Sequence, residues 1–392
     1  MSENFEKTEE QDIIREFSPK QKKRSFWRRF AFGSWIFALV AVLLVLGGSL
    51  VYKTGFTFSQ MQTGKEDLTF LLGDDNMATP TPESDRLNIL LLGLRGEGDP
   101  NGGLLTDSIM ILSYKKSTGQ VALISLPRDL YVMMPGQKYK EKINFAYALG
   151  FEKKGSAGAL LYSRVAVSQA TGLYFDYAVS IDHKALKEIV DILGGVNITL
   201  EKPFTETQQW TRGGDTGSSP YFFIRNETTQ ASSSAASGEK EVSQKWVFEI
   251  PAGTSHLDGE TALYFVRARY SSSDFDRVRR QQILLSAVKD KAFSLGFFAN
   301  PVKIYQVLET LGSNVRTNIP LGEIPGLISL AQKINSKDVI HKVFDTTPEG
   351  LLYSTKNEAG AYILLPQGDD FSKIKEACRD IFNVASPAGQ QN

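Results

Sequence analysis

Hydrophobic residues follow two patterns along the chain: one continuous run near the N-terminus, and many short runs after residue 86. The continuous run covers residues 30–52 and contains no charged residue. At a rise of about 1.5 Å per residue, a helix of this length crosses a hydrocarbon layer about 30 Å thick. No Ala-x-Ala cleavage site follows the run. We therefore predict an uncleaved transmembrane helix rather than a signal peptide.

The charges beside this run predict how the helix is oriented. Every ionisable residue between positions 17 and 29 is a lysine or an arginine. Positive charge before a first membrane helix keeps the N-terminus in the cytoplasm. We therefore expect a cytoplasmic basic tail at 1–29 and a single-pass anchor in the cell membrane. A linker at 53–85, containing Pro80 and Pro82, then leads to a domain outside the cell.

The short hydrophobic runs after residue 86 alternate between strand and helix spacing, which is typical of an α/β protein. We predict a mixed central β-sheet sandwiched by helices at 86–300, completed by an α/β extension at 301–392. Within it we predict a mobile surface insertion at 204–245, because Ala231–Gly238 includes no large apolar side chain. The expected strands are Leu87–Leu92, Ser108–Tyr114, Val121–Leu126, Tyr174–Ile181 and Val196–Leu200, and the expected helices include Ala157–Gln169, His183–Ile192 and Phe371–Phe382.

Residues 257–282 carry the clearest chemical signal. The run Leu263–Val266 is apolar and includes β-branched and aromatic side chains, which predicts a short buried strand. Arg267 and Arg269 would then project together just past its end, because alternate side chains on a strand share a face. Two like charges side by side repel unless an anion lies between them. The pair therefore favours anion binding over a solvated basic surface.

A helix is predicted to follow this pair, with Ser273 or Asp274 as its N-cap. Helical spacing groups Arg277 with Arg280 and Gln281. Cations and free backbone N–H groups at a helix N-terminus suit a phosphate or a pyrophosphate. Asp274 has two interpretations: a helix cap, or a carboxylate that orients an arginine.

Composition narrows the classes of function. The chain has 44 basic and 44 acidic residues, so its net charge gives no reason to expect nucleic acid as a partner. One cysteine excludes an intramolecular disulfide, and three scattered histidines argue against a Cys/His metal site. Arg95, Asp107 and Arg128 lie at predicted strand ends or in adjoining loops, where the sites of α/β proteins are usually built.

Several short motifs occur in the order found in a known family, and the ordered set is far more specific than any one of them. The motifs are Asn88–Gly93, Thr106–Met110, Ser125–Asp129, Lys142–Asn144, Asp191–Gly195 and Leu257–Gln282. On these motifs the chain resembles the LytR–CpsA–Psr proteins from about residue 86 to residue 288, and its predicted anchor corresponds to that family's single N-terminal anchor.

The resemblance implies a phosphotransferase outside the cytoplasmic membrane. Such enzymes move a glycopolymer from a polyprenyl-pyrophosphate carrier to a hydroxyl of peptidoglycan, with Mg²⁺ bridging the pyrophosphate and the lipid tail in an apolar tunnel. Asp107 would be a magnesium ligand or the partner of one. By position, the catalytic clamp on the pyrophosphate would comprise Arg128, Arg267, Arg269, Arg277 and Gln281. Arg95, Lys142, Arg280 and Asp274 are further candidates for substrate binding, although structural ion pairs would explain Lys142 and Arg280 equally well.

The chain departs from the resemblance at two positions. The family usually has an aspartate where this chain has Arg95, and an arginine where it has Leu105. Loss of a carboxylate weakens the expectation of magnesium, which proteins hold with one or two carboxylates plus phosphate oxygens. One hypothesis is that Arg95 replaces the missing arginine's charge while Glu97 or Asp99 assists the metal. The alternatives are a non-catalytic scaffold or regulator that binds wall glycan or lipid, and a lipid pyrophosphate hydrolase.

Overall fold

We describe the protein from a computed structural model, which covers residues 80–100, 102–209, 219–229, 241–294, 311–312 and 314–383. All of them belong to one compact unit, Thr54–Asn392. The predicted basic tail, the predicted membrane helix and most of the linker lie outside these residues. Within the described part, no helix is long and apolar enough to cross a membrane.

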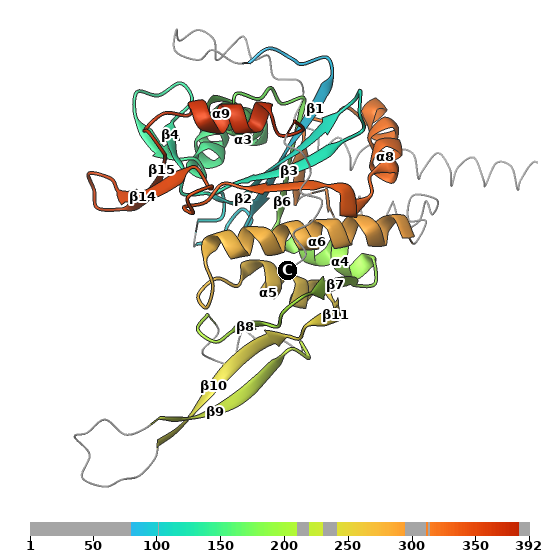
Figure 1. Ribbon diagram of the computed structural model, residues 1–392, viewed down its shortest axis with the longest axis vertical. Coiled ribbons are helices and arrows are strands. Elements are labelled where there is room, and N and C mark those ends of the chain that lie inside the picture. Colours follow the sequence, from blue (N-terminus) through green and yellow to red (C-terminus); the bar gives the residue numbers. More distant parts are fainter. Residues whose placement is uncertain are drawn as a thin grey trace, which may run out of the picture. The chain divides into compact units, whose positions relative to one another are not determined.

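A six-stranded mixed sheet forms the centre of the described domain (Figure 1). Its strand order is β12-β6-β1-β2-β3-β13. Strands β1, β2 and β3 form an antiparallel meander, while β6 pairs parallel with β1 and β13 pairs parallel with β3. The mixed central sheet predicted from the sequence is therefore confirmed. The strands are β1 (Arg86–Leu94), β2 (Thr106–Lys115), β3 (Val121–Leu126), β6 (Tyr177–Asp182), β12 (Val315–Thr317) and β13 (Ile340–Val343).

Helices cover both faces of this sheet, as predicted (Figure 1). On one face, α3 (Phe145–Thr171) and α9 (Ser372–Arg379) pack with β1, β2 and β3 around the larger hydrophobic core. The helices α4 (His183–Ile192), α5 (Gly259–Arg267) and α6 (Asp274–Ser294) lie on the other face. Helix α5 and Leu284 of α6 belong to a second core cluster. The site described below lies between this helical layer and the sheet.

The remaining elements are short and form the margins of the domain. Helix α8 spans Ile324–Lys333 between two 3₁₀ turns, Leu321–Glu323 and Ser336–Asp338. Four smaller sheets complete the described part: β8 (Phe204–Glu206), β10 (Glu241–Ile250) and β9 (Phe222–Thr229); β7 (Val196–Leu200) and β11 (Gly253–Leu257); β14 (Leu352–Lys356) and β15 (Tyr362–Pro366); β4 (Tyr131–Met133) and β5 (Lys140–Lys142).

The predicted strand Leu263–Val266 is wrong, because these residues lie in helix α5. The Asp258 carboxylate accepts a hydrogen bond from the Thr261 backbone N–H at 2.8 Å and so caps the helix. All four residues of the run are buried, so α5 is apolar on most of its surface. A short apolar run that is buried all round cannot be assigned to strand or helix from its spacing.

The predicted mobile insertion at 204–245 is wrong in part. It contains all of strands β8 and β9, and β10 begins within it. These strands pair antiparallel, and the inner end of β10 buries Val247, Phe248 and Ile250. The serine- and alanine-rich stretch 231–238 lies outside the described residues. The insertion is therefore anchored to the domain by a sheet of its own.

A candidate anion-binding site at the mouth of an apolar cavity

A cavity of about 550 Å³ separates the central sheet from the helical layer. Strands β1, β2 and β6 supply one wall, and helices α4, α5 and α6 supply the other. Apolar side chains form most of its lining, among them Met110, Val179, Ile181, Leu186, Leu285 and Val288. The polar lining residues include Arg95, Asp107, Arg267, Arg269, Arg277 and Gln281.

A β-bulge directs Asp107 into this site. Gly93 pairs with Ser108 and Leu94 pairs with Thr106, so Asp107 is the extra residue of strand β2. A bulge releases one residue from the regular alternation and turns its side chain in a new direction. Gly93 also permits the close approach of the strands, because a Cβ there would lie 3.0 Å from Ser108 Cβ.

Asp107 is held by three arginines. Arg128 Nη1 lies 2.5 Å from Oδ1 of Asp107, and Arg95 Nε lies 3.2 Å from Oδ2. The backbone carbonyl of Asp107 accepts a hydrogen bond from Arg277 Nη2 at 3.1 Å. Burial opposes ionisation of the carboxyl, but the charges of Arg128, Arg277 and Arg95 outweigh it and lower the pKa of Asp107. The carboxyl group of Asp107 is therefore ionised, and each of its two oxygens is already paired with an arginine.

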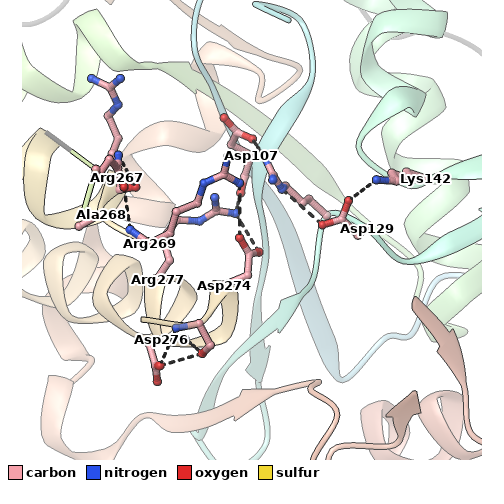
Figure 2. A network of polar contacts seen from close by, with 12 residues as sticks. Asp107, Asp129, Lys142, Arg267, Ala268, Arg269, Asp274, Asp276 and Arg277 are labelled. Carbon is pink, nitrogen blue, oxygen red and sulfur yellow. Dashed lines mark hydrogen bonds and ion pairs between the residues drawn. The ribbon is translucent and has the colours of Figure 1, made fainter. Parts of the chain in front are cut away.

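The network continues from Arg128 toward β5. Arg128 Nε lies 3.6 Å from an oxygen of Asp129, and Lys142 Nζ lies 2.7 Å from the other (Figure 2). Burial opposes the charge of Arg128, but Asp107, Asp274 and Asp129 together raise its pKa. Lys142 thus lies in an ion pair, which was the alternative explanation for this residue.

Arg267 and Arg269 leave the end of α5 and are held by a glutamine from the β8 region. Gln209 Nε2 donates to the carbonyl of Arg267 at 3.2 Å, and Gln209 Oε1 accepts from the Arg269 backbone N–H at 2.8 Å. The two side chains diverge: Arg267 points away from Arg277 and Asp274, while Arg269 lies beside them (Figure 2). Both side chains still line the cavity, although no strand carries them.

A buried carboxylate organises the loop between α5 and α6. Glu206, which is 1% exposed, accepts hydrogen bonds from the backbone N–H groups of Ser271, Gln208 and Gln209, and from Ser271 Oγ. Burial raises the pKa of this carboxyl, but the hydrogen bonds outweigh it, so the net shift is downward. Glu206 and Gln209 are not among the predicted site residues, because both lie in the predicted insertion.

The N-terminus of α6 resolves the two interpretations of Asp274. Ser273 Oγ accepts from the Asp276 N–H at 3.1 Å, and Asp276 Oδ2 accepts from the Ser273 N–H at 3.1 Å, which is a reciprocal cap. Asp274 instead accepts a hydrogen bond from Arg277 Nη2 at 3.0 Å and lies 4.0 Å from Arg269 Nη1. Asp274 therefore orients arginines.

Arg277 and Gln281 carry polar atoms whose hydrogen-bonding capacity is not met. The Arg277 side chain is 5% exposed, and burial lowers its pKa. Arg277 Nε and Gln281 Oε1 are buried, and neither has a hydrogen-bond partner among the described residues. A buried donor without a partner costs about 1–3 kcal/mol. Arg277 therefore has an unused donor that a ligand oxygen could satisfy.

Arg280 is also buried, but its contacts are structural. Its Nε donates to the carbonyl of Phe265 at 3.0 Å, and Nη2 donates to the carbonyl of Ala268. The guanidinium carbon lies 4.2 Å from the ring centroid of Phe204. Burial lowers the pKa of Arg280 to about 10. Arg280 thus closes the C-terminal end of α5, and it is not among the residues that line the cavity.

His183 is a lining residue that the sequence did not single out. It is the first residue of α4, directly after Asp182, whose carboxylate caps the helix through the Ala185 N–H at 2.8 Å. Burial and the charge of Arg267 lower the pKa of His183 to about 4, so its ring is neutral at pH 7. It can therefore donate or accept a hydrogen bond in the cavity without adding charge.

The site as a whole has a surplus of positive charge. Six cations face four carboxylates in it, so two positive charges stay uncompensated by these carboxylates. Guanidinium groups bind phosphate oxygens through paired N–H donors. The arrangement therefore suits a polyanionic head group attached to an apolar tail. The cations are Arg95, Arg128, Lys142, Arg267, Arg269 and Arg277, and the carboxylates are Asp107, Asp129, Asp182 and Asp274.

The described residues do not fit a bound magnesium ion. They include no group of three or more His, Cys, Asp or Glu side chains that could hold a metal. Both oxygens of Asp107, the expected ligand, are paired with arginines. Glu97 is exposed and Asp99 is partly buried, and neither completes such a group.

The fold and the site together define an α/β protein whose apolar cavity opens beside a cluster of arginines. A family model described as the LytR_cpsA_psr family matches residues 55–380, so the chain belongs to this family. The resemblance carried by the ordered motifs is thereby confirmed.

Two curated relatives illustrate the similarity. The chain is 26% identical over 352 residues to the polyisoprenyl-teichoic acid–peptidoglycan teichoic acid transferase TagT of Bacillus subtilis (strain 168), covering 86% of this chain and 92% of that protein. It is 25% identical over 288 residues to the transferase TagU of Bacillus cereus (strain AH820), covering 73% and 78%.

Solved structures share the fold. The crystal structure of B. subtilis TagV matches with a TM-score of 0.51 and 19% identity, covering 78% of this chain and all of that one. A structure of TagT bound to LIIa-WTA matches with a TM-score of 0.51 and 21% identity, covering 80% and 98%.

Proposed function

We propose that this protein is a phosphotransferase that moves a glycopolymer from a polyprenyl-pyrophosphate carrier to a hydroxyl of peptidoglycan. One observation carries the proposal: an apolar cavity of about 550 Å³ is continuous with a mouth lined by Arg267, Arg269 and Arg277. An isoprenoid tail needs the apolar part, and a pyrophosphate needs the cations. The names of the relatives TagT and TagU support the same substrate class.

The arginines supply what phosphoryl transfer requires. The reaction depends on positioning and on neutralising the charge of the phosphoryl oxygens, with little covalent chemistry left to the protein. We assign Arg267, Arg269, Arg277 and Gln281 to binding of the pyrophosphate. Arg277 has a buried Nε donor with no partner among the described residues, which a phosphate oxygen would satisfy. Asp107 and Asp274 hold Arg128, Arg269 and Arg277 in place.

The proposed reaction needs no reactant other than the carrier-linked glycan and the acceptor hydroxyl. The oxygen of the acceptor hydroxyl attacks the phosphorus that carries the glycan, and a new P–O bond forms. The bond from this phosphorus to the bridging oxygen of the pyrophosphate breaks, and polyprenyl phosphate leaves with the bonding electrons. The hydroxyl proton passes to solvent.

We also propose that residues 30–52 anchor the protein in the cell membrane, with 1–29 in the cytoplasm and the domain outside. The uncharged run and the basic residues before it support this orientation. A carrier whose tail lies in the bilayer would be reached by a domain held close to the membrane surface.

The test uses the full chain in detergent micelles with a polyprenyl-pyrophosphoryl glycan and peptidoglycan fragments, followed by mass spectrometry. We expect a glycan-phosphate adduct on the acceptor. Arg269→Ala should lower its rate of formation about 100-fold, the scale for losing one donor to developing charge. Arg225→Ala is the matched control, because Arg225 is 45% exposed and is paired with Glu249 on the β9–β10 hairpin.

Two other outcomes would contradict the proposal. Release of polyprenyl phosphate at the same rate with and without acceptor, and with no adduct, would identify a lipid pyrophosphate hydrolase. Tight binding of the lipid with no product under any condition would identify a scaffold or regulator.

A further inference from the structure

Arg95 places a positive charge beside the Asp107 carboxylate, which the resemblance implied as a metal ligand. It follows directly on strand β1, and its Nε lies 3.2 Å from Oδ2 of Asp107. Its side chain is 26% exposed and lines the cavity together with Arg267, Arg269 and Arg277. Arg95 is therefore both fixed by a carboxylate and open to a ligand.

The loop after Arg95 closes on itself and so fixes the backbone next to this residue. The Gly96 N–H donates to the carbonyl of Gly103 at 3.1 Å, and the Gly103 N–H donates to the carbonyl of Asp99 at 3.1 Å. A Cβ on Gly103 would lie 2.0 Å from the Gly96 carbonyl oxygen, so the closure requires glycine. Arg95 lies directly before this closed loop in the chain.

The pairing of Asp107 disfavours a metal in the same place. Each oxygen of Asp107 already accepts a hydrogen bond from an arginine, Arg95 or Arg128, whereas magnesium is usually held by one or two carboxylates plus phosphate oxygens. Among the described residues no cluster of three acidic, His or Cys side chains offers an alternative. A divalent cation bound at Asp107 would lie next to the guanidinium groups of Arg95 and Arg128 and would be repelled by both.

We propose that the guanidinium of Arg95 takes the place of a divalent cation in the transferase reaction. This inference rests on the proposed function. Arg95 uses Nε on Asp107, which leaves its two terminal nitrogens as donors for phosphate oxygens. A guanidinium stays charged at any physiological pH and does not dissociate. Transfer by this chain therefore proceeds without an added metal ion.

The first test compares the transfer rate of the full chain in EDTA and in MgCl₂. We expect the two rates of the wild-type protein to agree within about twofold. Arg95→Asp should lower the rate in EDTA about 100-fold, the scale for one lost contact to developing charge. Magnesium should restore part of that loss, because the introduced carboxylate and that of Asp107 would then lie next to each other and could share the ion.

The second test measures magnesium binding itself, by calorimetric titration of MgCl₂ into the full chain. The wild-type protein should show no saturable binding, whereas Arg95→Asp should show one site. Lys333→Asp is the charge-matched control, since it makes the same change of charge at an exposed position in the last turn of α8. It should bind no magnesium and keep the wild-type rate in both EDTA and MgCl₂.

The results separate this inference from the proposed function. A wild-type rate that is lost in EDTA and restored by magnesium overturns the role of Arg95 and leaves the transferase intact. The absence of product in both media overturns the transferase itself. If Arg95→Asp fails to fold, as seen from its thermal melting, the two wild-type measurements still decide the matter.

Discussion

Two arginines of the 257–282 stretch differ in role because they differ in what their guanidinium groups touch. Arg267 lines the cavity and points away from the other cations (Figure 2). Arg280 donates to the carbonyls of Phe265 and Ala268 and is 6% exposed. Both residues are basic and lie near the same turn, so their residue type alone does not separate a ligand-binding group from a structural one.

Paired variants at these positions should separate activity from stability. Arg280→Ala leaves two buried carbonyls without their donor, so we expect the free energy of unfolding to fall by about 2–3 kcal/mol. Arg267→Ala should leave the melting temperature unchanged and lower the transfer rate about 100-fold. Thermal melting and initial rates of the full chain measure both. A melting temperature that falls equally in the two variants would contradict this division of roles.

At the scale of elements, the loop between α5 and α6 is held from outside by Glu206 at the end of β8. Hydrogen bonds from Ser271, Gln208 and Gln209 lower the pKa of this carboxyl despite its burial. A group whose pKa is lower in the folded state stabilises the fold above its unfolded-state pKa, here near 4.5. That stabilisation is lost as the pH falls through the folded-state pKa, which lies below 4.5.

Because the pKa of Glu206 is lower in the folded state, the stability difference between the wild type and Glu206→Gln should depend on pH. At pH 7 the variant should be less stable than the wild type by about 2 kcal/mol. The gap should stay constant down to about pH 5 and narrow below the unfolded-state pKa. Denaturant unfolding of both proteins across this pH range measures it, with Glu249→Gln in a partly exposed ion pair as control. A gap that stays constant down to pH 3 would show that the charge of Glu206 contributes nothing.

The sequence predicted the elements whose pattern is local. Strands β1, β2 and β3 and helix α4 lie within two residues of their predicted limits. Strand β3 is buried along its whole length, but a turn precedes it and Pro127 follows it, and α4 ends just before Gly194 and Gly195. The strand predicted for Leu263–Val266 was wrong, because these residues are buried on all sides and show no regular alternation of buried and exposed positions. The sequence also failed to predict Glu206 and Gln209, whose partners lie about 60 residues away.

The residues of the candidate site could be predicted from the sequence, but their pairing could not. Asp107, Arg128, Arg267, Arg269 and Arg277 were singled out from strand ends and motif order. The structure joins Asp107, Arg128, Arg269 and Arg277 in one network through Asp107 and Asp274, and places Arg267 in the lining of the same cavity. Which of them pair with each other depends on the bulge at Gly93 and Leu94 and on the turn after α5. Neither feature has a signal in the spacing of hydrophobic residues.

At the scale of the whole molecule, the cavity exists because the two faces of the central sheet are packed differently. The face toward α3 and α9 closes into one continuous core. On the other face, residues of α5 and α6 pack with β7 and β10 in a separate cluster. The space left between that cluster and β1, β2 and β6 is the apolar cavity, with the arginines at its polar end.

Filling this space should separate binding of the tail from binding of the head group. Val179 of β6 lines the cavity, and the larger side chain of Val179→Trp would occupy part of it. We expect affinity for a long-chain polyprenyl pyrophosphate to fall about 100-fold, since each CH₂ kept from burial forfeits about 0.8 kcal/mol. Affinity for inorganic pyrophosphate should not change.

Thr254→Trp on the exposed edge of β11 is the matched control and should alter neither affinity. Titration of the full chain with pyrophosphates of increasing tail length gives the comparison. In the wild type, affinity should rise with tail length until the cavity is filled, whereas in Val179→Trp the rise should stop earlier. Equal weakening of inorganic pyrophosphate would mean that the tryptophan disturbs the arginines. Unchanged affinity for the long-chain pyrophosphate would mean that the tail binds elsewhere, because the cavity cannot hold the full tail and the tryptophan side chain together.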